Sequence, residues 1–477
     1  MQDGNSQVEP SEIRYLRECA EERGSGGICT TRRAKPWRLA DPVFVAPGAS
    51  SEPDNLCSYS LRGRRVMVTG PALPGSTVLT RSTDATAIFT DGHFPSVTAP
   101  NGATVTFAAL WFGTDATPEE CATSWGWLQE AIRHEWRDRF ATLHGTPATT
   151  GRDLFARSLG FDEWPVMSKE AQTIVRRTGG QGRMEMFRGS GRLTQLHEYD
   201  ARMAYVGLMD NLPVGEPDAL GAAQAASYQV ANPYREGRYY VQWTAPRDWR
   251  HPGILPAHTD GDSAGPAWHW PRQGEGWSSG VELFTALQAG WNVQIRGGIV
   301  WPAQGSPLRT WRGRLLRILA QSEALPVREH QLVRRAVRAI LLHTVGTFHG
   351  ASRKVTRTGT ADDIPDNAGG VRMLPDGRFT WWEWQWPAWA EMIHPEWSVT
   401  IWGRARARLL MGHRGSTGML TVDPSHLVAA RTDAVYTSQP TGWEAFDNGA
   451  PGRYRHQVFT GGDWPTTSAE LLTMRGT

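Results

Sequence analysis

LHEYDARMAYVGLMDNLPVG, residues 196–215, is the stretch around which the rest of the chain is organised. Its β-prone first part ends in a single carboxylate, Asp200, and Tyr205 follows five residues later, before the closing LPVG. A carboxylate placed where a strand gives way to a turn can point into a cleft and hold a divalent metal through its oxygens. The stretch therefore predicts a strand that presents Asp200, and the rest of the chain must supply the groups that such an aspartate needs.

The composition is that of an ordinary globular protein. The 477 residues, 40% of them hydrophobic and 21% charged, are enough for two or three domains with sizeable cores. No apolar run approaches the roughly 18 residues of a membrane span, and the polar N-terminus does not resemble a signal peptide. We therefore expect a cytoplasmic protein without a membrane segment.

The charge and cysteine content exclude some classes of protein. A net charge of +2 excludes a grossly basic protein but allows a local basic cleft. Nearly all of the 50 basic residues are arginine, whose planar fork suits phosphates, although a GC-rich genome produces the same bias. The four cysteines have no C-x-x-C spacing, which argues against a zinc site and against a disulfide framework.

The N-terminal third divides into two parts. Residues 1–60 are rich in Gly, Ser, Pro and charge, and they predict a loosely ordered extension. The short β-type runs VMVTG, STVLT, ATAIFT and ATVTFAALWFG then predict a small sheet. Thr117 is expected to cap an amphipathic helix that reaches about Leu143, with Pro118 at its first position.

The remainder predicts alternating strands and helices from its apolar pattern. The helix expected at 327–343 carries Arg334, Arg335 and Arg338 between its apolar positions. Strands are expected at residues 239–246, 290–302 and 378–387, and a hairpin at 427–437. Helices are expected at 327–343 and 396–411, and another is expected to begin within 146–160. Residues 276–290 form an amphipathic segment.

The opening stretch resembles the first catalytic motif of family B DNA polymerases, D-x-x-S-L-Y-P-S-x-M followed by L-P-x-G. Asp200, Tyr205 and LPVG match, whereas the S-L and P-S around the tyrosine are lost. The resemblance implies that Asp200 is a catalytic metal ligand and that Ala201 and Tyr205 bind the nucleotide. The tyrosine would form the platform under the sugar that excludes a 2′-hydroxyl.

The segment IVRRTGGQGRMEMF, residues 174–187, resembles the Y-x-G-G/A element, followed by R-x-E, with which protein-primed members contact the template strand. Gly182, Arg183 and Glu185 match, but the tyrosine does not. The resemblance implies that Gly180, Gly182 and Arg183 bind DNA.

Two further segments match family patterns. The segment at 276–290 resembles the pattern that precedes a palm strand, which implies that Glu282 is a buried, paired acid rather than a catalyst. The predicted helix at 396–411 resembles an I-T-A-x-A-R element that packs under the palm, and its Ile401, Ala405 and Arg406 match.

The arginine-bearing helix is similar to the second motif, K-x-x-x-N-S-x-Y-G. Arg338 takes the place of the lysine and Gly346 that of the glycine, while the polar centre of the motif is lost. The resemblance implies that Arg338, helped by Arg334 and Arg335, binds the triphosphate and that Gly346 borders the nucleotide.

The hairpin LVAARTDAVYT resembles the third motif, D-T-D-S. Thr432 and Asp433 match, and Arg431 stands where the first aspartate is expected. The resemblance implies that Asp433 is the second catalytic metal ligand. Arg431 would either weaken metal binding or contact a phosphate or the primer end. Arg453 or Arg455 would replace the lysine of a K-x-Y element near the primer terminus.

The resemblance covers about residues 146–445 and implies an α+β right-hand polymerase, with palm, fingers and a small thumb in residues 151–477. Residues 61–150 would be a degenerate exonuclease-like α/β domain, because the D-x-E and Y-x-x-x-D proofreading motifs are absent. The implied activity is that of a DNA-directed DNA polymerase closest to the protein-primed type of phages and linear plasmids. Two Mg²⁺ or Mn²⁺ ions on Asp200 and Asp433 would serve the transfer of dNTPs to a primer or protein hydroxyl.

The implied partners are a DNA template and primer, a dNTP, and a terminal protein or other priming protein. The alternative is a catalytically inactive pseudo-polymerase that binds nucleic acid, which Arg431 and the lost centre of the second motif favour. A third interpretation, an unrelated metal-dependent nuclease, lacks the clustered acids that it would need.

Overall fold

The structure is a computed structural model, and only part of the chain is described here. Most of the predicted extension at residues 1–60 and the runs STVLT and ATAIFT lie outside that part. The described residues are 42–45, 66–68, 97–98, 104–159, 164–180, 182–188, 193–259, 267–350, 353–365, 368–374, 376–385, 392–412 and 417–460.

A small sheet opens the described chain, in the order β1-β2-β4-β3, with β3 antiparallel to β4 and the other pairings parallel. One of its strands, β1, belongs to the stretch expected to be a loose extension, and the end of ATVTFAALWFG is a short helix, α3, rather than a strand. The elements are β1 (Val43–Val45), β2 (Val66–Val68), β3 (Val97–Thr98), β4 (Thr104–Phe107) and α3 (Ala109–Phe112).

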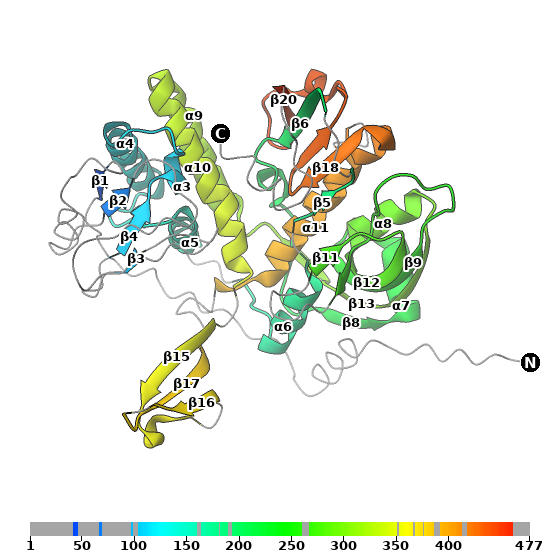
Figure 1. The fold of residues 1–477 in the computed structure, drawn as a ribbon, viewed down its shortest axis with the longest axis horizontal. Helices are drawn as coiled ribbons and strands as arrows, with labels where there is room; N and C mark the ends of the chain where they lie inside the picture. Colours follow the sequence, from blue (N-terminus) through cyan, green and yellow to red (C-terminus); the bar gives the residue numbers. More distant parts are fainter. Residues whose placement is uncertain are drawn as a thin grey trace, which may run out of the picture.

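Helices follow and share one hydrophobic core with α3 (Figure 1). The first begins as predicted, with a capping box between Thr117 and Glu120, but ends at Trp136 rather than near Leu143. The predicted 327–343 helix is confirmed and runs on to Phe348 with its apolar stripe buried. These helices are α4 (Pro118–Trp136), α5 (Pro147–Ser158), α9 (Arg309–Gln321) and α10 (Val327–Phe348).

The central sheet has the order β20-β6-β19-β18-β5, and every pairing in it is antiparallel. It contains the stretch with Asp200 in β6 and the predicted hairpin in β18 and β19, although the two are far apart in sequence. Its strands are β5 (Met184–Met186), β6 (Gln195–Ala201), β18 (Leu427–Arg431), β19 (Ala434–Thr437) and β20 (Tyr454–Thr460).

A second four-stranded sheet, β12-β9-β13-β8, lies beside the central one in Figure 1. The strands predicted at 239–246 and 290–302 are confirmed in β9 and β13. The elements are β8 (Asp218–Gly221), α7 (Ala222–Ala231), β9 (Gly237–Thr244), β12 (Gln273–Ser279), α8 (Gly280–Gln288) and β13 (Asn292–Val300).

Smaller elements complete the described chain. A three-stranded sheet projects from the body as a separate lobe (Figure 1), and its middle strand is the one predicted at 378–387. No helix in the described ranges is long and apolar enough to cross a membrane. The elements are α6 (Lys169–Thr178), β7 (Leu212–Val214), β10 (Ala257–Thr259), β11 (Ala267–His269), β14 (Ala303–Gly305), β15 (Arg353–Gly359), β16 (Gly369–Met373), β17 (Phe379–Gln385) and α11 (Pro395–Met411).

A buried ion pair joins α8 to α11 beneath the central sheet. Arg406 donates to both carboxylate oxygens of Glu282, from Nε at 2.7 Å and from Nη2 at 3.0 Å. Burial alone would raise the pKa of Glu282, but Arg406 outweighs it and holds that pKa below its ordinary value. The expectation that Glu282 is a buried, paired acid is confirmed.

Glu282→Gln should destabilise the protein by about 3–5 kcal/mol, because it leaves the buried guanidinium of Arg406 without its counter-charge. Urea unfolding followed by tryptophan fluorescence measures the loss. Arg378→Gln is the matched control, since its pair with Asp376 lies at the surface, and no measurable change is expected there. Equal stability of the two variants would contradict the structural role of the buried pair.

Candidate active site

Strand pairing brings the two predicted carboxylates together. Ala434 of β19 lies directly opposite Asp200 of β6, and the backbone N–H of Ala201 donates to the carbonyl of Asp433 at 3.0 Å. Asp433 therefore lies in the β18–β19 turn, next to the end of β6. Two aspartates separated by more than two hundred residues reach the same end of the same sheet.

The turn that carries Asp433 has an unusual backbone. Thr432 has φ +49°, a left-handed conformation that is strained for a β-branched residue. Its backbone N–H donates to the carbonyl of Arg183 at 2.6 Å, and its hydroxyl donates to Oδ1 of Asp433 at 2.8 Å. The turn thus fixes the backbone before Asp433 and orients the carboxylate.

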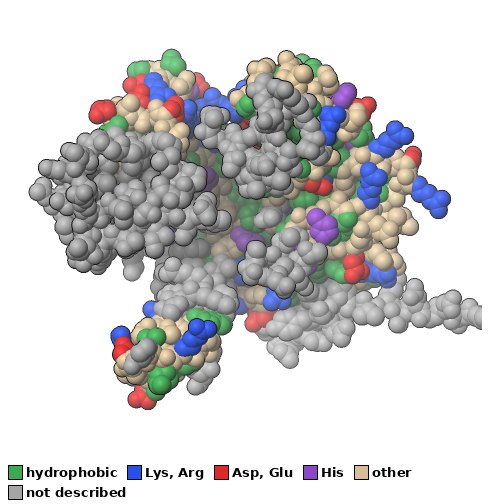
Figure 2. Space-filling model, viewed as in Figure 1, with side chains coloured by type: hydrophobic (Ala, Val, Ile, Leu, Met, Phe, Trp, Pro, Cys, Tyr) green, Lys and Arg blue, Asp and Glu red, His purple; other side chains and the backbone are tan. Residues whose placement is uncertain are grey.

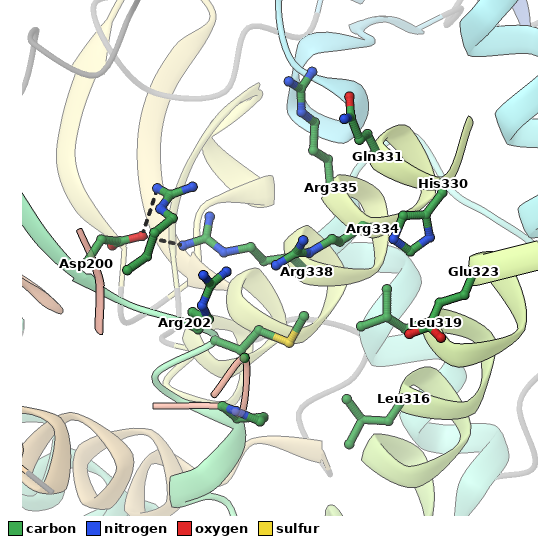
Figure 3. A pocket seen from close by; sticks show the side chains of 14 residues that line it. Asp200, Arg202, Leu316, Leu319, Glu323, His330, Gln331, Arg334, Arg335 and Arg338 are labelled. Carbon is green, nitrogen blue, oxygen red and sulfur yellow. Dashed lines mark hydrogen bonds and ion pairs between the residues drawn. The ribbon is translucent and has the colours of Figure 1, made fainter. Parts of the chain in front are cut away.

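Asp200 is held by two guanidinium groups (Figure 3). Arg455 lies opposite it on β20, with Nη2 at 3.3 Å from Oδ2, and Nη2 of Arg338 on α10 lies 3.9 Å from the same oxygen. The Asp200 side chain is only 6% exposed. The sequence suggested Arg453 or Arg455 for a thumb position, and the structure places Arg455 in the central sheet itself.

A cleft of about 780 Å³ opens between this end of the sheet and helices α9 and α10. Figure 2 shows Lys and Arg side chains in the hollow between these elements. The lining residues are Asp200, Arg202, Met203, Leu316, Leu319, Glu323, His330, Gln331, Arg334, Arg335, Arg338, Gly449, Pro451 and Arg455.

Four of these residues, Arg202, Arg334, Arg338 and Arg455, form what we call the arginine cluster. Burial lowers the pKa of Arg334, and the positive charges of the other three members lower it further. Asp447 binds one member, Arg202, at 2.6 Å, which lowers the pKa of the carboxyl group and raises that of the guanidinium. Mutual repulsion of this kind favours a polyanionic ligand in the cleft.

Arg335 differs from its two neighbours on α10. In Figure 3 it is turned away from Asp200, and its Nη1 donates to the carbonyl of Phe112 at 2.8 Å and contacts Asp115. The hydrogen bond from Arg335 is the main reason why the pKa of Asp115 falls to about 2. Arg335 thus ties α10 to the N-terminal helices. Gly346, exposed near the end of the helix, does not line the described cleft.

Two residues that follow Asp200, namely Ala201 and Tyr205, interact with Asp433. Burial raises the pKa of Tyr205, and the Asp433 carboxylate raises it further, which places the phenol near that charge. Ala201 is buried and contributes its backbone N–H to the strand pairing.

Arg431, half-buried at the end of β18, lies opposite Ala434 and Met184. The carbonyl of Arg453 accepts from the backbone N–H of Arg202 at 2.8 Å.

The glycine-containing turn lies behind the hairpin. Gly180 has φ +69°, and a Cβ on Gly182 would meet the side chain of Thr432 at 3.0 Å, so both positions favour glycine. The Arg183 side chain is fully buried and donates to Glu185 at 3.0 Å and to the carbonyl of Gly253 at 2.8 Å. Its DNA-binding role stays a prediction, and this burial argues for support of the hairpin instead.

Two carboxylates supply the candidate metal donors. Within the ranges that the structure describes, no group of three or more His, Cys, Asp and Glu side chains is arranged to hold a metal. The carboxylates of Asp200 and Asp433 carry oxygens, the kind of ligand that hard divalent cations take, and such ions fill further positions with water and substrate phosphates.

Comparison with known proteins gives a fold but no family. No protein-family model matches the sequence, and no curated protein is significantly similar to it. Phi29 DNA polymerase in its orthorhombic crystal form matches with a TM-score of 0.52 and 12% identity, over 85% of this chain and 78% of that one. Its binary complex with primer-template DNA matches with a TM-score of 0.50, 13% identity, and coverage of 85% and 78%.

The ternary complex of phi29 DNA polymerase with primer-template DNA and incoming nucleotides matches with a TM-score of 0.50 and 12% identity, over 85% of this chain and 79% of that one. At such low identity the similarity concerns the fold alone. The mixed α and β chain has a distant phi29 DNA polymerase-like fold, which confirms the coarse form of the fold prediction.

Proposed function

We propose that this protein is a DNA-directed DNA polymerase of family B, nearest the protein-primed type, without proofreading activity. One observation carries the proposal. Asp200 lines a cleft whose opposite wall presents the arginines of α10, and strand pairing places Asp433, in the adjacent β18–β19 turn, next to the strand that carries Asp200. Nucleotidyl transfer needs this combination of metal-binding carboxylates and triphosphate-binding cations.

Each group has a defined task in this reaction. Asp200 and Asp433 would hold two Mg²⁺ or Mn²⁺ ions, whose chemistry when bound is to activate the primer 3′-hydroxyl and to neutralise the leaving pyrophosphate. Arg334 and Arg338 bind the triphosphate with charge-assisted hydrogen bonds. Tyr205, near Asp433, lies under the sugar and excludes a 2′-hydroxyl.

The proposal assigns the parts of a right-hand polymerase to elements of the fold. In this assignment the central sheet would be the palm, α9 and α10 the fingers, and the segment that leads into β20 a small thumb. Residues 61–150 are a degenerate exonuclease-like scaffold, with the family's proofreading motifs missing from the sequence. The structures of phi29 DNA polymerase bound to primer-template DNA and incoming nucleotides support DNA and dNTPs as ligands.

The second candidate function is a pseudo-polymerase that binds nucleic acid without catalysis. Two observations favour it. Arg431 stands where a catalytic aspartate is expected, and Asp200 is paired with two arginines. Priming from a terminal protein, and an origin in a phage or linear plasmid, are further parts of the polymerase proposal that follow from the sequence resemblance.

A primer-extension assay with Mg²⁺ or Mn²⁺ tests the polymerase proposal. The wild-type protein should extend a primed DNA template, and Asp433→Asn should reduce extension below detection, because it removes one of the two metal-binding charges. DNA binding, measured as a function of salt, should remain in the variant. A wild-type protein that binds DNA and incorporates no nucleotide would leave the pseudo-polymerase as the function.

Adjacent arginines on α10 provide a matched pair of variants. Arg334→Gln should raise the KM for dNTPs roughly 10- to 100-fold, since a charge-assisted hydrogen bond contributes about 1.5–3 kcal/mol. Arg335→Gln should change that KM little and instead lower the melting temperature, because Arg335 binds Asp115 and Phe112. Steady-state kinetics and thermal unfolding separate the two effects. Equal KM changes would contradict the orientations in Figure 3.

A further inference from the structure

Asp200 lies among positive charges that a metal ion would have to approach. The arginine cluster surrounds its cleft, where the lining acids are Asp200 and Glu323, and Asp447 binds Arg202. The Asp200 carboxylate is almost entirely shielded from solvent, so water screens the charge of this carboxylate only weakly. A divalent cation entering here would meet the guanidinium groups of Arg338 and Arg455 at Oδ2.

We propose that Arg338 and Arg455 pair with Asp200 and keep cations from binding it until a polyphosphate anion binds the two arginines. Anion binding then precedes and permits cation binding. Arg455 is then a positioning residue that keeps the carboxylate charge-paired in the ligand-free protein. The inference rests on the proposed function, because it concerns the same carboxylate. It adds the order in which anion and cation bind, and it assigns a role to Arg455 of β20.

The exposure of the two side chains suits such an exchange. The Arg338 side chain is 37% exposed and that of Arg455 51%, so both guanidinium groups reach the solvent of the cleft while Asp200 does not. Guanidinium forks bind phosphate oxygens in a bidentate manner, and a polyphosphate offers several such oxygens. Once phosphate oxygens bind the two guanidinium groups, these groups no longer compete with a cation for Oδ2 of Asp200.

The anion also changes the charge that the cation meets. A polyphosphate placed among the cluster replaces net repulsion with attraction and adds its own oxygens as ligands. Anion and cation binding are therefore positively coupled, and the coupling is reciprocal. A second consequence follows from the charges: a polyanion should bind the cluster even without a metal.

The register of β20 explains why Arg455 holds this position. Arg455 pairs with Asp200 across the two strands, while its neighbour Tyr454 is buried in the core. Because its side chain is half exposed, Arg455→Gln removes the charge without opening a cavity. The variant therefore tests the interaction and leaves the fold in place.

The test measures binding of Mn²⁺ and of inorganic pyrophosphate separately, with the full chain. Mn²⁺ is titrated into metal-free protein without any anion and followed by electron paramagnetic resonance. Arg455→Gln should bind Mn²⁺ about 5-fold or more tighter than wild type, the lower end of typical coupling factors. Asp200→Asn in the Arg455→Gln background should abolish this gain, which assigns the ion to Asp200. Arg309→Gln, an exposed arginine outside the cleft, is the matched control and should match wild type.

The second arm titrates pyrophosphate into protein in the presence of a chelator, followed by calorimetry. Wild type should bind it without metal, Arg455→Gln should bind it more weakly, and Asp200→Asn should bind it at least as tightly because its arginines are released. Unchanged or weaker Mn²⁺ binding by Arg455→Gln, or pyrophosphate binding that requires metal, would overturn the proposed order. Failure of the polymerase function is distinguishable, since it would appear as absent primer extension with these binding results intact.

Discussion

The antiparallel pairing of β6 with β19 is the constraint on which the candidate site depends. Opposite residues in such a ladder lie about 4.5–5.5 Å apart, so the pairing of Asp200 with Ala434 also fixes where Asp433 can be. A slip of one residue would turn Asp200 to the other face of the sheet and separate the two carboxylates. Buried neighbours on both strands, such as Tyr199 and Val435, make that slip costly.

Buried arginines, and not apolar packing alone, stabilise the pairing of β6 with β19 through contacts with the β18–β19 turn. Arg406 binds Glu282 and contacts the carbonyl of Gly179, which holds the glycine-containing turn against α11. The turn leads into Arg183, whose carbonyl accepts from the strained Thr432. A chain of contacts therefore runs from one buried ion pair to the residue before Asp433. Glycine at position 182 allows this approach, because a Cβ there would lie only 3.0 Å from the side chain of Thr432.

The sequence identified the local features of the site but missed those that depend on distant strands. The Thr117 cap, the apolar stripe of α10 and the strand that carries Asp200 near its end follow from spacing and residue type, and all are present. Arg335 shares a helix with Arg338, yet it turns to Asp115, which no helical pattern reveals. The sequence suggested Arg455 only as a replacement for a lysine near the primer terminus, and tertiary pairing of β20 with β6 places it against Asp200.

The electrostatics of the cleft explain why a protein with a net charge of only +2 can still favour polyanions. Charge that is spread over a surface attracts little, whereas four guanidinium groups facing one cleft concentrate the field and steer a polyanion toward it. Arg431 adds a positive charge at the end of β18. Because an arginine stands at the place of one expected aspartate, the site gains a positive charge and loses a metal ligand. Both changes favour binding of phosphate before binding of a metal. A metal would then depend on oxygens that the anion brings, because no group of three or more metal-ligating side chains lies among the described residues, and the candidate donors are Asp200 on β6 and Asp433 in the β18–β19 turn.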